Sequence, residues 1–120
     1  MLDIGALTDP AVRFVVARLN GEVVGSGAVV LEEGGRAELK RMFVRENMRG
    51  HGIGRAVLQV LEQIAYRENR SLVRLETGLK QPEAISLYKR LGYTECDPFE
   101  PYGPDPYSVF LEKRLDTGLR

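Results

Sequence analysis

The sequence predicts a mixed α/β fold in which a mostly antiparallel sheet carries helices on its faces. Two observations lead to this prediction. Three runs rich in β-branched residues come first, and two helical patterns then alternate with further short strands. The chain has 120 residues, of which 43% are apolar, and this is enough to build one hydrophobic core. We therefore expect a single domain over residues 1–120.

The first three strands are expected between residues 12 and 44. Val12–Leu19 and Glu22–Leu31 flank the dipeptide Asn20-Gly21, which tolerates the positive φ angles of a two-residue turn, so the two runs predict a β-hairpin. A glycine-containing turn follows. Arg36–Val44 then alternates loosely between polar and apolar residues and is expected to add a third antiparallel strand.

A long amphipathic helix is expected from Ile53 to about Asn69, because apolar residues recur there at helical spacing. These residues are Ile53, Ala56, Val57, Val60, Leu61, Ile64 and Ala65. The strand that follows, Leu72–Thr77, comes after a crossover helix and is therefore expected to lie parallel to the strand before that helix.

The last part of the chain predicts a second helix and a final pair of strands. Pro82 suits the first turn of a helix over Ala84–Leu91, and Gly92 suits its C-terminal end. Tyr93–Cys96 and Tyr107–Arg114 are the expected strands. The segment DPFEPYGPDPY between them contains four prolines and a glycine, which is typical of a stiff loop.

The composition argues against several classes of function. Lys and Arg number 17 and so do Asp and Glu, so the chain lacks the basic excess typical of nucleic-acid or anionic-membrane binding. The single cysteine, Cys96, allows no internal disulfide and no CxxC metal pair, so no structural metal and a reducing cytoplasm are expected. The first residues do not resemble a signal peptide, and no run of 18 apolar residues occurs.

Charge is nevertheless distributed unevenly along the chain. Residues 36–55 contain six basic and two acidic side chains, whereas residues 95–105 contain four acidic ones and no Lys or Arg. The first region suits an anion and the second a cation. The alternative is that both regions are ordinary solvated faces, and the charges alone favour that alternative.

Three glycines, Gly50, Gly52 and Gly54, stand where the long helix should begin. The first N–H groups of a helix have no partner within the helix, and the helix dipole adds partial positive charge there. Glycines would let a phosphate approach these amides, and Arg49 and Arg55 would add charge. The alternative is a tight turn without a ligand. The spacing fits neither the P-loop nor the GxGxxG motif.

Two motifs in this region resemble those of the GCN5-related N-acetyltransferases. Arg49-Gly50-His51-Gly52-Ile53-Gly54 matches the R/Q-x-x-G-x-G/A signature, and the strand LKRMFV precedes it. The segment AISLYKRLGY, Ala84 to Tyr93, is similar to the A-x-x-L-Y-x-x-x-G-F/Y segment of the same family. The resemblance covers roughly Val12 to Arg114. It implies an acyl-coenzyme A N-acyltransferase fold that lacks most of the usual N-terminal strand and helices.

The resemblance implies acetyl-coenzyme A as the cosubstrate and assigns residues to it. The loop amides would bind the pyrophosphate, and the preceding strand would offer backbone groups to the pantetheine arm. The residues concerned are Arg49, Gly50, His51, Gly52, Ile53, Gly54 and Arg55 for the pyrophosphate, and Met42, Phe43 and Val44 for the arm. Tyr88 would contact the cosubstrate and protonate the departing thiolate.

The remaining catalytic groups are less clearly marked. A strand N–H near Phe43 or Val44 would stabilise the oxyanion if a bulge breaks the local ladder. Glu38 and Glu76 are the candidate general bases, and Glu38 is taken as the first, although the sequence alone favours a solvent-facing strand position for each. Tyr88 by its spacing also suits a core position. Cys96 is disfavoured as a nucleophile because nothing in the sequence activates it.

The sequence therefore predicts an acetyl-coenzyme A-dependent N-acetyltransferase that acts on a primary amine of a small molecule or peptide. The acidic and aromatic segment 95–107 is expected to form the acceptor side. A non-catalytic acyl-coenzyme A-binding regulatory module is the first alternative, and a structural dimerisation module is the second. The missing N-terminal helices leave a surface open, so two alternatives remain: a chain that is naturally short, or a homodimer in which the partner subunit covers that surface.

Overall fold

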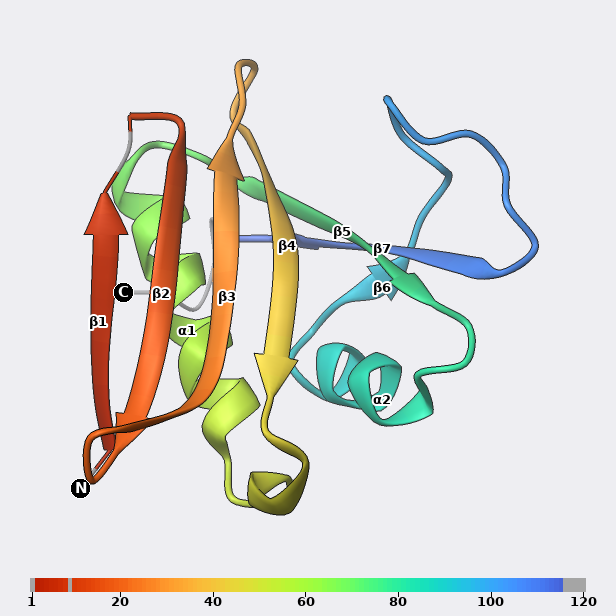
Figure 1. The fold of residues 1–120 in the computed structure, drawn as a ribbon. Helices are drawn as coiled ribbons and strands as arrows, with labels where there is room; N and C mark the ends of the chain where they lie inside the picture. Colours follow the sequence, from red (N-terminus) through yellow and green to blue (C-terminus); the bar gives the residue numbers. More distant parts are fainter. Residues whose placement is uncertain (1, 9, 116–120) are drawn as a thin grey trace.

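The computed structural model describes residues 2–8 and 10–115. These residues form a seven-stranded sheet in the order β1-β2-β3-β4-β5-β7-β6, with two α-helices (Figure 1). The strands are β1 (Leu2–Thr8), β2 (Val12–Leu19), β3 (Glu22–Leu31), β4 (Arg36–Val44), β5 (Leu72–Gly78), β6 (Thr94–Glu95) and β7 (Ser108–Arg114). The helices are α1 (Ile53–Arg67) and α2 (Pro82–Arg90), and a short 3₁₀ turn, η1 (Glu46–Met48), precedes α1. Within the described ranges, no helix has both the length and the apolar character needed to cross a membrane.

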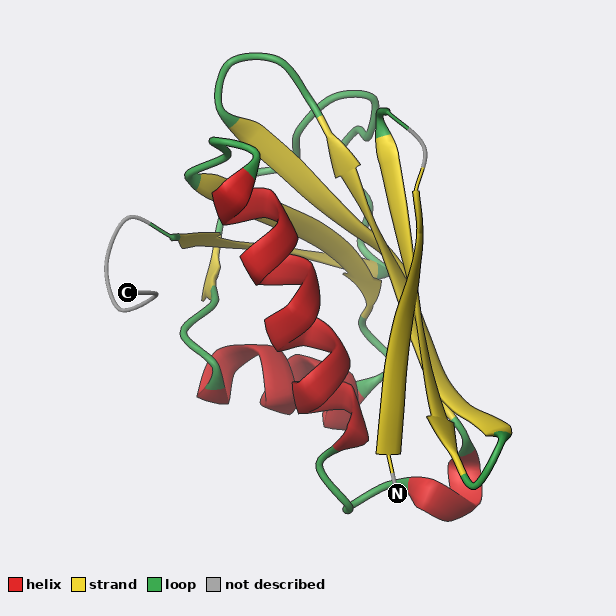
Figure 2. Cartoon of the chain, turned by 90° about the vertical axis from the view of Figure 1, so that its left-hand side faces the viewer, coloured by secondary structure: helices red, strands yellow, loops and turns green. Residues whose placement is uncertain are grey.

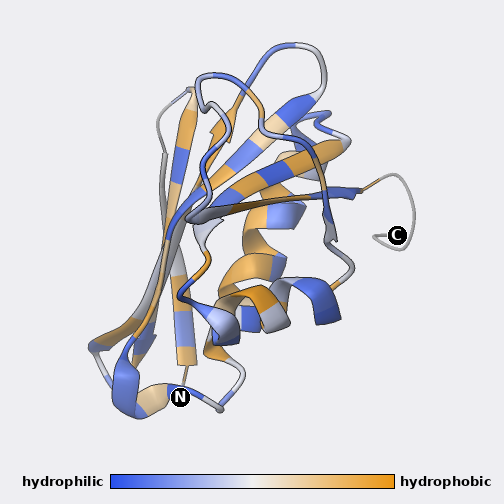
Figure 3. Ribbon diagram, turned by 90° about the vertical axis from the view of Figure 1, so that its right-hand side faces the viewer, coloured by the Kyte–Doolittle hydropathy of each residue, from blue (hydrophilic) through white to orange (hydrophobic). Residues whose placement is uncertain are grey.

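The sheet has the mixed pairing that the sequence predicts. β2, β3 and β4 pair antiparallel in succession, β4 and β5 pair parallel, and β7 pairs antiparallel with both β5 and β6. The hairpin turn at Asn20 and Gly21 has φ angles of 52° and 85°, which only a few residue types tolerate. Apolar and polar positions alternate along the strands, as Figure 3 shows.

One strand was not predicted. The sequence analysis expected most of an N-terminal strand to be missing, but Leu2–Thr8 forms β1 and pairs antiparallel with β2. Ile4 lies opposite Ala17 and packs against the core. Asp3 and Gly5 weaken the β pattern of this segment, so its strand depends on pairing with β2 more than on its own sequence.

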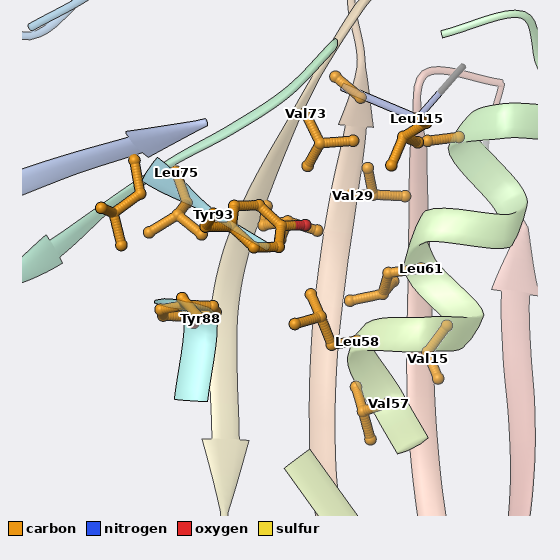
Figure 4. Packing of buried hydrophobic residues seen from close by; sticks show 14 of the residues in the cluster. Val15, Val29, Val57, Leu58, Leu61, Val73, Leu75, Tyr88, Tyr93 and Leu115 are labelled. Carbon is orange, nitrogen blue, oxygen red and sulfur yellow. The ribbon is translucent and has the colours of Figure 1, made fainter. Parts of the chain in front are cut away.

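The core lies between the sheet and α1, which crosses one face of the strands (Figure 2). Figure 4 shows Val57, Leu58 and Leu61 of α1 directed toward Val15 and Val29 of the sheet. The predicted stripe of α1 needs a correction. Of its members, Ala56, Val60 and Ile64 are only half-buried, and the helix is rotated so that Leu58 and Glu62 lie in the core instead.

Candidate active site

A cleft opens where β4 and β5 separate. The two strands pair in parallel from Arg36 opposite Leu72 to Leu39 opposite Leu75, and beyond this point they diverge (Figure 1). The cleft has a volume of about 1610 Å³, and its walls come from the open ends of both strands, the glycine turn and α2. The residues of β4 beyond Leu39 therefore lose their ladder on one side, which leaves backbone groups available to a ligand.

A β-bulge in β4 lies at the start of this opening. The pairing of β3 with β4 shifts register so that Gly27 of β3 faces both Arg41 and Met42 of β4. Arg41 adopts a φ of 56°, which is uncommon for a residue with a side chain. A Cβ on Gly27 would lie 2.5 Å from the Met42 sulfur, so any larger residue there would force the Met42 side chain to move. The condition that the sequence analysis set for an oxyanion-binding amide near Phe43, a bulge in this strand, is thus present.

The three glycines before α1 serve two different purposes. Gly50 and Gly52 have φ angles of 83° and 78°, and a Cβ on either would meet no other protein atom within 4 Å. A Cβ on Gly54 would instead lie 3.0 Å from Leu87 and 3.2 Å from Val44. Gly54 therefore allows α1, α2 and β4 to pack closely. Gly50 and Gly52 keep the turn in a left-handed conformation and leave space in front of it.

The amides of this turn are unpaired. Within the described part of the chain, no N–H from residue 50 to residue 55 donates to a protein carbonyl, and the first helical bond joins Ala56 N–H to the Gly52 carbonyl at 3.0 Å. Gly52 provides no side-chain cap for α1. Arg49 and Arg55 are both exposed and both line the cleft, and Arg49 lies 3.8 Å from Glu83. Free helix amides beside two cations form a site suited to an anion with several oxygens.

Tyr88 of α2 lines the same cleft and is 5% exposed. Burial raises the pKa of Tyr88 to about 12, because the apolar surroundings disfavour the phenolate. The phenol therefore keeps its proton at neutral pH and can act as a hydrogen-bond donor or a general acid. The sequence left a core position and an acid role open for Tyr88, and the structure places its side chain in the core cluster and at the cleft wall.

Glu38 and Glu76 lie on the sheet face opposite α1, because their neighbours along β4 and β5 point into the core. Glu38 is 2% exposed, and its carboxylate accepts a hydrogen bond of 2.6 Å from the Tyr102 hydroxyl. Burial, followed by the hydrogen bond to Glu38, raises the pKa of Tyr102. Glu76 lines the cleft and accepts a hydrogen bond of 2.5 Å from Ser108 of β7. The structure thus places both candidate bases on one face.

The loop between β6 and β7 reaches this face with its aromatic side chains. The rings of Phe99, Tyr102 and Phe110 lie within 5.8 Å of one another, and Lys40 lies 5.8 Å above the Tyr102 ring. Two acidic residues of segment 95–107 have partners within the protein. Glu95 of β6 pairs with Lys89 at 3.0 Å, and Asp105 of the loop accepts a hydrogen bond from the backbone N–H of Tyr107. The aromatic residues thus supply the contact with the sheet.

Cys96 has the environment of an unreactive thiol. Burial and the nearby charge of Glu112 raise the pKa of Cys96 to about 11. The side chain therefore remains protonated at neutral pH and is a poor nucleophile.

The structure brings most of the predicted site residues to one cleft. Ten of them line it: Met42, Phe43, Val44, Arg49, Gly50, Gly52, Ile53, Gly54, Arg55 and Tyr88. Two do not. His51 is exposed and does not line the cleft. Glu38 does not line the cleft either, and its carboxylate accepts a hydrogen bond from the Tyr102 hydroxyl.

Several lining residues were missed by the sequence analysis. Arg41 escaped notice because a bulge leaves no mark in one sequence. Pro82, Ser86 and Arg90 also line the cleft, and their spacing of four residues places them along one side of α2. That spacing was visible in the sequence and would have identified this side of the helix once Tyr88 was placed near the cleft.

Comparisons with known proteins identify the family. The model of the acetyltransferase (GNAT) family matches residues 2–93. An IAA acetyltransferase from Azospirillum brasilense is 47% identical over 116 residues, which cover 96% of this chain and 76% of that protein. A solved structure of an acyl-CoA N-acyltransferase from Klebsiella pneumoniae superimposes with a TM-score of 0.90 and 36% identity, covering 96% of this chain and 98% of that one.

A more distant solved structure adds a bound ligand to the comparison. The PaiA N-acetyltransferase from Thermoplasma acidophilum, in complex with coenzyme A, has a TM-score of 0.77 at 20% identity, with 88% of this chain and 62% of that chain covered. At this identity the likeness shows the shared fold. Taken with the family match and the A. brasilense relative, it leads to one assignment: the chain belongs to the GNAT family of acetyltransferases, enzymes that use acetyl-coenzyme A as the acyl donor.

Proposed function

We propose that this protein transfers the acetyl group of acetyl-coenzyme A directly to a primary amine of a small molecule or a peptide. The observation that supports this proposal most strongly is the open half of the β4–β5 pair. There, unpaired amides at the glycine turn, a bulged strand and a buried tyrosine all border one cleft. Acetyl-coenzyme A has a pyrophosphate, an extended pantetheine arm and a thioester, and these three groups suit the amides, the strand and the tyrosine in turn.

The residues present fit coenzyme A. Gly50 and Gly52 leave open space in front of free helix amides, and Arg49 and Arg55 add positive charge, as a pyrophosphate requires. Residues 42–44 would hold the pantetheine arm through backbone groups that β5 no longer pairs. The Thermoplasma neighbour, which shares the fold, was solved in complex with coenzyme A, and this supports coenzyme A as the ligand. When bound, the cosubstrate supplies an activated acetyl thioester.

Two proton-transfer roles follow for the side chains of this chain. Tyr88 holds a proton on its hydroxyl at neutral pH and would donate it to the leaving sulfur. On the other side, the amine must lose a proton. We assign Glu38 as the final acceptor of that proton. The Tyr102 hydroxyl would accept the proton from the amine and pass its own proton to the Glu38 carboxylate. Glu76, which lines the cleft, is the competing acceptor.

The acceptor is proposed to be a cationic amine because of the charges on this face. Glu38 and Glu76 lie there together, and both also act in raising the pKa of Tyr102 by their negative charge. An ammonium ion would be attracted by these carboxylates and by the aromatic faces of the loop. Lys40, 3.9 Å from Glu38, offsets part of that negative charge.

Two measurements on the purified chain test the proposal. Isothermal titration calorimetry with coenzyme A tests the cradle, and thiol release from acetyl-coenzyme A with a panel of amines tests the reaction. We expect micromolar to millimolar binding of coenzyme A and amine-dependent thiol release with at least one amine. Binding without any turnover would favour a regulatory module that senses acyl-coenzyme A. A failure to bind coenzyme A would overturn the proposal itself.

A further inference from the structure

Glu62 is a carboxylate in the middle of the hydrophobic core. It lies on α1, is 3% exposed, and has the apolar residues Leu58, Leu61 and Ala65 beside it on the helix. Two groups satisfy it. Lys113 of β7 lies 3.1 Å from Oε1 and 3.3 Å from Oε2, and the Tyr93 hydroxyl donates to Oε2 at 2.6 Å. Glu62 is buried, whereas 23% of the Lys113 side chain is exposed. Removing the Glu62 carboxylate from water carries a cost that can exceed its attraction to Lys113, so stability alone explains this pair poorly.

Tyr93 connects this pair to the end of α2. Gly92, with a φ of 100°, ends the helix, and the N–H of Tyr93 donates to the Tyr88 carbonyl at 3.0 Å. The N–H of Gly92 donates to the Lys89 carbonyl at 3.2 Å, which completes the Schellman motif. This motif places Tyr93 against Tyr88, and their rings lie 5.8 Å apart at 63°. Figure 4 shows Tyr93 crossing the core with its hydroxyl directed toward α1.

Packing determines the position of the Tyr88 ring. The ring belongs to the core cluster, and among the described residues the Tyr88 hydroxyl has no hydrogen-bond partner. The Tyr93 ring packs edge-on against the Tyr88 ring, whereas Tyr93 itself is fixed at its far end by the bond to Glu62. Neither Tyr93 nor Glu62 lines the cleft.

We infer that the Lys113–Glu62 pair positions Tyr88 for proton donation, acting through Tyr93. Glu62 and Tyr93 are positioning residues: they touch no substrate, and their effect on the reaction passes through the Tyr88 ring. This inference rests on the proposed function, in which Tyr88 is the acid. It explains why the buried carboxylate of Glu62 on α1 binds both Lys113 of β7 and Tyr93, which follows α2.

A double-mutant cycle tests the inference, with kcat and the KM for acetyl-coenzyme A as readouts. Tyr93→Phe removes only the hydroxyl and keeps the ring. We expect it to lower kcat about three- to tenfold while leaving that KM unchanged, because small displacements of a catalytic group reduce the rate more than binding. Tyr88→Phe/Tyr93→Phe should have the same kcat as Tyr88→Phe alone. Tyr66→Phe, which removes a hydroxyl from a half-buried tyrosine of α1, is the matched control and should retain the wild-type kcat.

Glu62→Gln provides a second route to the same result if Tyr93→Phe folds poorly. It keeps the volume and an acceptor for Tyr93 but loses the charge that Lys113 holds in place, so the fall in kcat should again disappear in the Tyr88→Phe background. A decrease in kcat that persists in that background would overturn the inference, and so would a Tyr93→Phe enzyme with wild-type kcat. An unchanged kcat in Tyr88→Phe would instead show that the acid was wrongly assigned, which is a failure of the proposed function.

Discussion

The two halves of the β4–β5 pair are built from the same strands and have opposite uses. In the paired half, residues 36–39 and 72–75, the backbone groups are joined in a parallel ladder and the alternate side chains fill the core. In the open half, residues 40–44 and 76–78, that ladder is missing and the strands form the walls of the cleft. The difference shows that the site is made by ending a pairing early.

A single inserted residue separates the two halves. The bulge opposite Gly27 changes the direction of β4 just after Leu39, the last residue of β4 that pairs with β5. The glycine turn lies beyond the end of this strand. The paired half thus fixes the direction of β4 and the bulge changes it.

The largest effect is expected from blocking the glycine turn, which borders the open half and carries the amides proposed to bind the pyrophosphate. Gly52→Val places a β-branched side chain at a φ of 78° and fills the space in front of the free amides. The affinity for coenzyme A should fall about a hundredfold, because several charge-assisted hydrogen bonds would be lost. Isothermal titration calorimetry measures this change.

The control for Gly52→Val must carry the same backbone strain elsewhere. Gly21→Val suits this purpose, because Gly21 has a φ of 85°, also faces open space, and lies in the β2–β3 turn outside the cleft lining. It should lose stability but retain coenzyme A binding. Equal losses of affinity in the two variants would mean that strain, and not the cradle, causes the effect.

The second prediction asks which half supplies the base. Glu38 belongs to the paired half and Glu76 to the open half. If the Tyr102 hydroxyl passes the amine proton to Glu38, Glu38→Gln should lower kcat at least about a hundredfold, the lower end of typical general-base effects. Glu76→Gln should lower it less than tenfold.

A third variant, which removes an exposed carboxylate from the cleft wall, serves as the control for the two Gln variants. Glu83→Gln serves as the reference, because Glu83 also lines the cleft but is 79% exposed. It should retain a kcat near that of the wild type. The reverse ranking, with Glu76→Gln the slower enzyme, would move the base to the open half and leave Glu38 as a partner of Tyr102.

A smaller effect is expected at the boundary between the halves. Gly27→Ala places a methyl group 2.5 Å from the Met42 sulfur and 3.0 Å from Leu61. The flexible Met42 side chain can move, so the free energy of unfolding should fall by only about 1–3 kcal/mol. Because Met42 lines the cleft, the KM for acetyl-coenzyme A should rise a few-fold.

Thermal or urea unfolding and steady-state kinetics measure these two changes. Gly5→Ala in β1 is the control, since a methyl group there meets no atom within 4 Å and lies outside the cleft. A Gly27→Ala protein with unchanged stability and KM would show that the bulge does not depend on glycine.

Much of this arrangement could be predicted from sequence because its causes are local. The turn at Asn20-Gly21, Gly50 and Gly52 before α1, and Gly92 after α2 each mark a backbone that few other residues tolerate. The bulge at Arg41 and the β1 strand could not be predicted in this way. Both depend on neighbouring strands, namely on Gly27 across the ladder and on pairing with β2.

Glu62 illustrates a signal that was present and not used. It follows Leu58 by four residues and precedes Ala65 by three, so the helical pattern places it on the buried stripe. An acid at such a position predicts a buried partner. The partners themselves, Tyr93 and Lys113, lie 31 and 51 residues farther along the chain, and only the fold brings them to the carboxylate.

The smallest effect is expected from pH, and it tests the acid that borders the open half. The pKa of Tyr88 is raised to about 12 by burial, so its proton is lost only as pH rises through about 12 and not near its ordinary value of 10. Between about pH 8 and 10, kcat at saturating acetyl-coenzyme A and amine should therefore remain level. Tyr88→Phe should give a profile of the same shape at a lower rate. A decline in kcat centred near pH 10 in the wild type, which Tyr88→Phe abolishes, would contradict this prediction. It would mean that the Tyr88 phenol titrates as if exposed to water, and that Tyr88 acts as the acid from a solvent-exposed position and not from the buried one.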